Sequence, residues 1–138
     1  MPGFKTILLW LLAAFWLGVI YYFGRAGFGR ANTQVIIDRV KHHPRIWHFL
    51  DRHHGKIRAS FHYFEFGLCY AILYLGFTLG KMEWYYGRGF LAWFLTGFLA
   101  FLDEMHQKKS GGRCFRKVDL LHSILGGSLA MIFFYIFG

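Results

Sequence analysis

The sequence has few acidic residues, few cysteines and none of the common nucleotide or redox motifs. The 138 residues include seven Asp and Glu residues, compared with sixteen Lys and Arg residues, and two cysteines. Cys69 and Cys114 form no CxxC pair, so the cysteines indicate neither a disulfide pattern nor a metal site. There is also no Walker loop, no Ser-His-Asp order and no CxxCH sequence, which disfavours nucleotide hydrolysis and covalent haem.

Apolar residues, by contrast, are abundant. The chain is 56% hydrophobic and 22% aromatic, which is far from an ordinary globular composition. Four apolar runs carry at most one charged residue each, and a helix that crosses the bilayer core needs about 20 such residues. The third run is shorter and spans only if its flanking residues lie in the interfacial zones. We therefore predict an all-α integral membrane bundle of four transmembrane helices, in one domain, over about residues 4–23, 58–80, 86–106 and 118–138.

The first run, residues 4–23, is also N-terminal, which raises the alternative of a signal peptide. It is longer than a typical signal-peptide core and is followed by a poor match to a cleavage site. A first membrane helix is therefore the preferred interpretation.

A basic, histidine-rich loop, residues 24–57, separates the first two predicted helices. Within it Pro44 is suited to start a short helix over residues 45–52. Ile46, Trp47 and Phe49 make that helix amphipathic. We expect this segment to lie along the membrane surface, with its basic residues toward the headgroups.

The basic residues are distributed unevenly between the two sides of the predicted bundle. Four alternating spans place thirteen of the sixteen Lys and Arg residues on the side of the first and third loops. The positive-inside rule makes that side cytoplasmic in a cell membrane, although basic residues that hold a substrate phosphate would give the same count. We expect anionic membrane lipids, and not nucleic acid, as the partners of this charge.

Three predicted helices carry a carboxylate and a histidine three residues apart, at the ends that meet on the basic side. The residue pairs are His62 with Glu65, Asp103 with His106, and Asp119 with His122. Residues at i and i+3 are neighbours on a helix surface. Ionisable groups within membrane helices cost about 2.5 kcal/mol or more near the bilayer centre and less near its surface. Three such pairs at one level favour a functional polar site over a purely structural hydrogen-bonded plug.

The same residues carry a resemblance to a known family. "HYFEF" at 62–66, "DEMHQ" at 103–107, "GGR" at 111–113 and "DLLHSILGG" at 119–127 resemble, in order and spacing, the VanZ-like family of small integral membrane proteins. The resemblance covers residues 56–130. It implies a helical membrane bundle in the cell envelope and a link to antibiotic resistance, since the family takes its name from a protein linked to teicoplanin resistance. The sequence departs from the family pattern at Phe66, where a tyrosine is common, and in its first and third loops.

Two main hypotheses follow for the polar cluster. In the first, the protein is an enzyme that acts on a phosphorylated or glycosylated lipid, because carboxylates and imidazoles are the usual general acids and bases. The candidate catalytic residues are His62, Glu65, Asp103, Glu104, His106 and Asp119. The candidate ligand-binding residues are Arg58, Gln107, Arg113, His122 and Ser123. A variant places a divalent metal among Glu65, Asp103, Glu104 and Asp119, joined by histidines if the ion is zinc or manganese.

In the second hypothesis the protein is a non-catalytic accessory subunit or scaffold of a larger membrane complex, and the cluster locks the helices together. Transport, with the cluster as an ion relay, is a third alternative. Four short helices leave little room for a transport pathway without oligomerisation.

Overall fold

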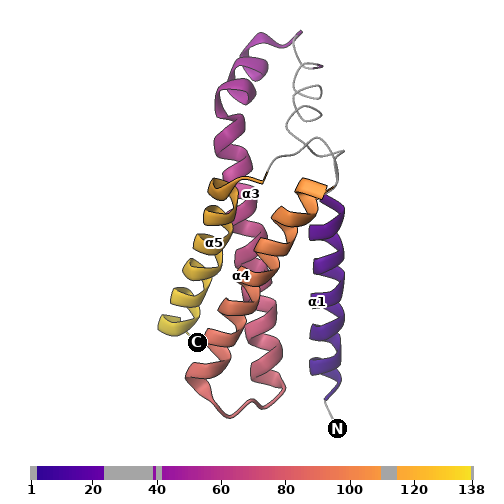
Figure 1. The fold of residues 1–138 in the computed structure, drawn as a ribbon, viewed down its shortest axis with the longest axis vertical. Coiled ribbons are helices and arrows are strands. Elements are labelled where there is room, and N and C mark those ends of the chain that lie inside the picture. The colour runs from indigo at the N-terminus through magenta and orange to yellow at the C-terminus, as the bar shows by residue number, and fades with distance from the viewer. Residues whose placement is uncertain (1–2, 24–38, 40–41, 110–114, 138) are drawn as a thin grey trace.

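The computed structural model describes residues 3–23, 39, 42–109 and 115–137. These residues form four helices, labelled as in Figure 1: α1 (Phe4–Phe23), α3 (Pro44–Leu79), α4 (Tyr85–Lys109) and α5 (Lys117–Phe137). The described part of the chain contains no strand, in agreement with the all-helical prediction. Helices α1, α4 and α5 begin and end within three residues of the ranges expected from the sequence. Half of the predicted basic loop, residues 24–38 and 40–41, lies outside the described residues.

Helix α3 is longer than the sequence indicated. It runs for 36 residues from Pro44, which lies in its first turn, where a missing backbone N–H costs nothing. The sequence predicted a loop up to residue 57, with a separate surface helix over residues 45–52. A helix does begin at Pro44 as predicted, but the prediction that it is separate from the second span is wrong, because one continuous helix joins the two segments. After Pro44 the only helix-weakening residue before the predicted span is Gly55, and a single glycine is tolerated inside a helix.

The N-terminal part of α3 consequently extends beyond the rest of the bundle. At about 1.5 Å per residue, α3 is roughly 54 Å long, and Figure 1 shows its first turns rising past the ends of α1, α4 and α5. The remaining turns of α3 are central and contact all three other helices.

An apolar core forms along one face of α3. Phe66, Cys69, Tyr70 and Leu73 are buried, and their spacing of i, i+3, i+4 and i+7 places them on one side of the helix. They pack with buried residues of the neighbouring helices, namely Ile20, Ala92 and Ala100. The core holds the bundle below the polar residues described in the next section.

Helices α3 and α5 approach each other closely at Gly126. A Cβ atom on Gly126 would lie 2.5 Å from the backbone oxygen of Tyr63 and 2.8 Å from its Cα atom. Gly67, one turn further along α3, would bring its own Cβ to 3.4 Å from the backbone oxygen of Gly126. Small residues allow helix backbones to come this close. The contact brings the first turns of α5 against the middle of α3.

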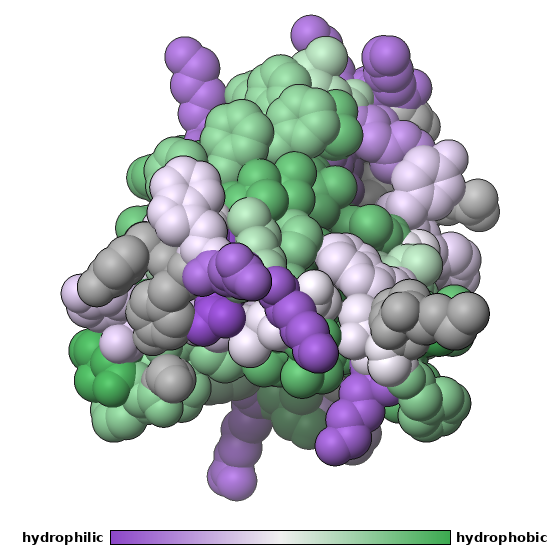
Figure 2. Space-filling model, turned by 90° about the horizontal axis from the view of Figure 1, so that it is seen from below, coloured by the Kyte–Doolittle hydropathy of each residue, from purple (hydrophilic) through white to green (hydrophobic). Residues whose placement is uncertain are grey.

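The exterior of the bundle is strongly apolar. Large hydrophobic side chains are exposed along α4 at Phe90, Phe94, Phe98 and Phe101. In the view from below, hydrophobic areas cover much of the visible face, with some hydrophilic side chains near its centre and others projecting at its edge (Figure 2). Two helices, α1 and α5, are long and apolar enough to cross a membrane. Together these features weakly indicate a membrane protein, because water-soluble proteins rarely expose apolar surface on this scale.

Candidate functional site

A group of buried polar side chains lies where α4 ends, α5 begins and α3 passes between them, at the upper end of the bundle in Figure 1. We call these residues the polar cluster: His62 on α3, Asp103, Glu104 and Gln107 on α4, and Asp119 and Ser123 on α5, with Arg58 at the edge on α3. All but Arg58 are buried. Six of the seven are thus removed from the surroundings of the protein, so their partners within the bundle decide their chemistry.

An ion pair joins α3 to α5 in this cluster. Nη2 of Arg58 donates a hydrogen bond to Oδ2 of Asp119 at 2.6 Å. The Asp119 side chain is 5% exposed and the Arg58 side chain 17%, so the pair is largely withdrawn from solvent. Nη1 of Arg116 lies 3.7 Å from the same oxygen, with its side chain 46% exposed. Two guanidinium groups therefore face one carboxylate, one inside the bundle and one at its surface.

His62 lies next to this ion pair and is linked to α5 through Ser123. The Ser123 hydroxyl donates to the backbone oxygen of Asp119 at 3.0 Å and lies 3.3 Å from Nδ1 of His62. Because the hydroxyl proton is already used, this network assigns the Nδ1–H to His62 as the donor to Ser123. Nε2 then faces the carboxylates and lies 3.9 Å from Oδ2 of Asp119.

Helix α4 contributes two carboxyl groups with different neighbours. Oε2 of Glu104 accepts a hydrogen bond from the backbone N–H of Arg116 at 3.0 Å. Its Oε1 is buried and has no hydrogen-bond partner within the part of the chain that the structure describes. Asp103 instead accepts a 2.5 Å hydrogen bond from the side-chain amide of Gln107, one turn along the same helix.

Three of these residues form a group that could hold a metal ion. His62, Glu104 and Asp119 each offer one donor atom, and the three atoms lie within 4.8 Å of one another. Each residue comes from a different helix, and all three are buried. One imidazole and two carboxylates can bind a divalent cation or exchange protons, and the adjacent arginines can hold an anion.

Other candidates from the sequence have different surroundings. The ring of His106 stacks on Tyr21 of α1, with centroids 4.2 Å apart. His122 packs against the ring of Tyr63, and its buried Nδ1 has no hydrogen-bond partner among the described residues. Glu65 accepts a hydrogen bond at its backbone oxygen from the Trp16 indole. None of the three belongs to the metal-like group of His62, Glu104 and Asp119.

Arg113, the remaining candidate, lies outside the described residues. Arg116 was not among the candidates, yet it contacts the cluster twice, through its backbone N–H and its guanidinium. A signal was present in the sequence, since Arg116 precedes Asp119 by three residues at the start of a helix.

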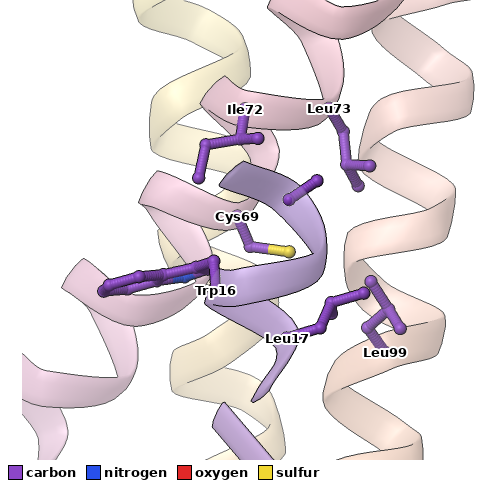
Figure 3. A pocket seen from close by; sticks show the side chains of 7 residues that line it. Trp16, Leu17, Cys69, Ile72, Leu73 and Leu99 are labelled. Carbon is purple, nitrogen blue, oxygen red and sulfur yellow. The ribbon is translucent and has the colours of Figure 1, made fainter. Parts of the chain in front are cut away.

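A small apolar pocket lies apart from the cluster, between α1, α3 and α4. Figure 3 shows Trp16, Leu17, Cys69, Ile72, Leu73 and Leu99 around it. Its volume of about 10 Å³ is the space of roughly one water molecule. A cavity of that size holds no lipid or metabolite, so the polar cluster is the stronger candidate site.

Comparison with known proteins gives one result that covers most of the chain. The protein-family model described as VanZ/LLP1 matches residues 8–138. No curated protein matches the chain, and no solved structure matches it. The matched range includes every residue of the polar cluster.

Proposed function

Since this chain belongs to the VanZ/LLP1 family, whose model matches residues 8–138, we propose that it is a multi-pass membrane protein that binds an anionic lipid headgroup. The headgroup is that of a phosphorylated or glycosylated lipid, and the polar cluster is where it binds. The family match gives a VanZ-like protein but no reaction, so the proposal rests on the site itself.

Four membrane spans are supported by the outward faces of the helices. Helices α1 and α5 qualify as spans by length and hydropathy. The polar residues of α3 and α4 lower their overall hydropathy. On α4, Asp103, Glu104 and Gln107 are buried at the cluster, whereas most polar residues of α3 lie on its protruding first turns. The outward face of α4 carries Phe90, Phe94 and Phe98, and that of α3 carries Phe61 and Phe64. Such faces suit contact with lipid chains on all four helices.

The orientation follows from charge. The cluster lies at the end of the bundle where α4 ends in Lys108 and Lys109 and α5 begins at Lys117. Thirteen of the sixteen Lys and Arg residues belong to this side by sequence. The positive-inside rule then makes the cluster cytoplasmic and both termini external.

The observation that carries the headgroup proposal is the incomplete pairing of Arg58. Its Nη2 is bound to Asp119, but its Nε is buried without a hydrogen-bond partner in the described residues. A guanidinium has five N–H donors, and phosphate or hydroxyl oxygens are suitable acceptors for those left over. Arg116, half exposed beside it, provides a second cation at the surface where a headgroup would enter.

The neighbouring groups suit chemistry on such a headgroup. His62 can accept or deliver a proton at Nε2, which lies 3.9 Å from Oδ2 of Asp119. Asp103 and Glu104 supply two further buried carboxyl groups. This is the arrangement expected of a general acid–base pair beside an anion-binding clamp.

A second function has its own support. The Arg58–Asp119 ion pair and the His62–Ser123 contact both connect α3 to α5. In a non-catalytic subunit of a larger membrane complex, the same contacts would serve only to hold the helices together, a role that we call a packing lock. Breaking a buried ion pair by removing one partner costs about 3–5 kcal/mol, so a purely structural role predicts a large loss of stability and no change in bound lipid.

The experiment compares lipids that remain bound to the protein after purification. The parent and the Arg116→Gln variant are purified in mild detergent, and the extracted lipids are identified and counted by mass spectrometry. We expect an anionic lipid in the parent and at least about tenfold less of it in Arg116→Gln, because a half-exposed arginine contributes to headgroup binding more than to folding.

Arg45→Gln is the matched control, because Arg45 is exposed on the protruding part of α3. It is expected to retain the lipid of the parent. If Arg116→Gln and Arg58→Gln both retain that lipid, and only Arg58→Gln melts at a lower temperature, the packing lock replaces the headgroup site.

A further inference from the structure

We propose that His62, Glu104 and Asp119 bind one divalent transition-metal ion, Zn²⁺ or Mn²⁺. Three helices, α3, α4 and α5, supply one ligand each, and the donor atoms lie within 4.8 Å of one another. The site does not require a bound lipid, because its ligands are all side chains of this chain.

Glu104 gives the first independent indication of a ligand. It is only 1% exposed, and its Oε1 has no hydrogen-bond partner in the described parts of the chain. A buried carboxylate oxygen without a donor costs several times the free energy of an ordinary hydrogen bond. Glu104 belongs to the three-residue group, so a cation at the centre of the group would pair with this carboxylate. Its Oε2 is meanwhile held by the backbone N–H of Arg116.

The orientation of His62 gives the second indication. Its Nδ1 lies 3.3 Å from the Ser123 hydroxyl, whose proton is directed to a backbone oxygen. The imidazole is thus held through Nδ1–H, and a neutral ring presents the Nε2 lone pair toward the carboxylates. Metal-bound histidines are held in this way, with the second ring nitrogen donating to an oxygen that fixes the tautomer.

The balance of charge within the group gives the third indication of a bound cation. Glu104 and Asp119 are the two buried carboxyl groups of the three-residue group, and the largely buried guanidinium of Arg58 is bound to Asp119. The contacts of Asp119 described above all use Oδ2, so a cation bound through Oδ1 leaves the ion pair with Arg58 in place. Two carboxylates within 4.8 Å repel each other when ionised, and a divalent cation between them removes that repulsion.

The distances suit a transition metal after small side-chain rotations. Ligand atoms around one tetrahedral zinc ion lie roughly 3.4 Å apart, given bonds of about 2.0–2.2 Å. One nitrogen and two oxygen donors favour zinc or manganese, whereas calcium and magnesium prefer oxygen alone. Three protein ligands also leave a coordination position open, as catalytic metal sites do.

The test measures metal binding by the full chain in detergent, purified with a tag that contains no histidine. The protein is stripped with EDTA and loaded with Zn²⁺ or Mn²⁺. Unbound ions are removed by gel filtration, and the retained metal is counted by mass spectrometry of the elements. We expect about one ion per chain in the parent and at least about tenfold weaker binding in Glu104→Gln, which keeps the size of the side chain and an acceptor for the Arg116 N–H.

Two matched variants separate the site from other donors. Glu83→Gln removes an exposed carboxylate at the opposite end of the bundle, and His53→Ala removes a histidine from the protruding part of α3. Both are expected to bind metal like the parent. Unchanged binding in Glu104→Gln, or no saturable binding in the parent, overturns the proposal.

A second variant and a spectroscopic measurement cover the case in which Glu104→Gln does not fold. His62→Gln is measured in the same way, and the parent is loaded with Co²⁺, whose visible absorption reports nitrogen and oxygen ligands. Loss of the cobalt spectrum in His62→Gln supports the site, and an unchanged spectrum contradicts it. Because no lipid is added and no arginine is altered, this result is independent of the headgroup experiment.

Discussion

At the scale of single residues, His62 and His106 lie at the same end of the bundle with different neighbours. His62 is buried beside Ser123 and Asp119. His106 is only partly buried and stacks on the Tyr21 ring of α1. A ring stack needs an aromatic face, whereas proton transfer or metal binding needs a ring nitrogen. Substitution of each histidine by phenylalanine, which keeps an aromatic face but removes the ring nitrogens, therefore distinguishes their two roles.

We predict that His106→Phe retains the metal and lipid binding of the parent, because phenylalanine preserves the stack on Tyr21. His62→Phe is expected to lose at least about tenfold in metal affinity, because no ring nitrogen remains for the cation. Both variants are measured by metal content and by thermal melting in detergent. Equal loss in the two variants, at unchanged melting temperature, would place His106 in the site as well.

At the scale of helices, the contact between α3 and α5 decides how the cluster is assembled. Gly126 lies two turns after Asp119 on α5, and its position against the backbone of Tyr63 fixes both the separation and the rotation of the two helices. Tyr63 directly follows His62 in the chain. The closeness of the helices at Gly126 is therefore what allows Ser123 and Asp119 to reach His62.

We predict that Gly126→Ala destabilises the protein by roughly 1–3 kcal/mol, the usual cost of overpacking a close contact. The new methyl group would lie 2.5 Å from the Tyr63 oxygen, so the helices must separate. Gly97→Ala on α4 is the control, because a Cβ there meets nothing within 4 Å, and its helix propensity improves. The melting temperatures of both variants are measured in detergent. Equal stability of the two variants would show that the contact between α3 and α5 can accommodate a methyl group at position 126.

At the scale of the whole molecule, the large hydrophobic side chains face outward, whereas the polar cluster is buried between the helices near one end of the bundle. Large exposed hydrophobic side chains run along the helices, while the cluster lies at the end where Lys108, Lys109 and Lys117 gather. This separation suits a bundle that spans a membrane with its site near one surface.

We predict that residues 83 and 109 lie on opposite sides of the membrane. Glu83→Cys and Lys109→Cys are made separately in a Cys69→Ala, Cys114→Ser background, and sealed vesicles are treated with a membrane-impermeant maleimide. Both positions are exposed, one before α4 and one at its end. We expect Lys109→Cys to react only from the cytoplasmic side and Glu83→Cys only from the other. Labelling of both from one side would contradict a membrane-spanning α4.

The sequence by itself determined the local features of this protein. The lengths of the apolar runs predicted α1, α4, α5 and the C-terminal part of α3, because burial in lipid or in a core depends on hydrophobicity along the chain. Carboxylates and histidines at three helix ends predicted a polar cluster; six of its predicted members are buried, and three of these, His62, Glu104 and Asp119, are grouped. The resemblance to the VanZ-like family, carried by the same short motifs, is confirmed by the family match.

Only the tertiary structure decided which member of each pair faces the others. A spacing of i and i+3 fixes the angle between two side chains on their own helix, but not the rotation of that helix or the neighbour it meets. The close packing at Gly126 orients Asp119 and Ser123 toward His62. The ring of His106 instead stacks on Tyr21 of α1. The grouping of His62 with Glu104 and Asp119 therefore depends on three helices at once, which no single stretch of sequence contains.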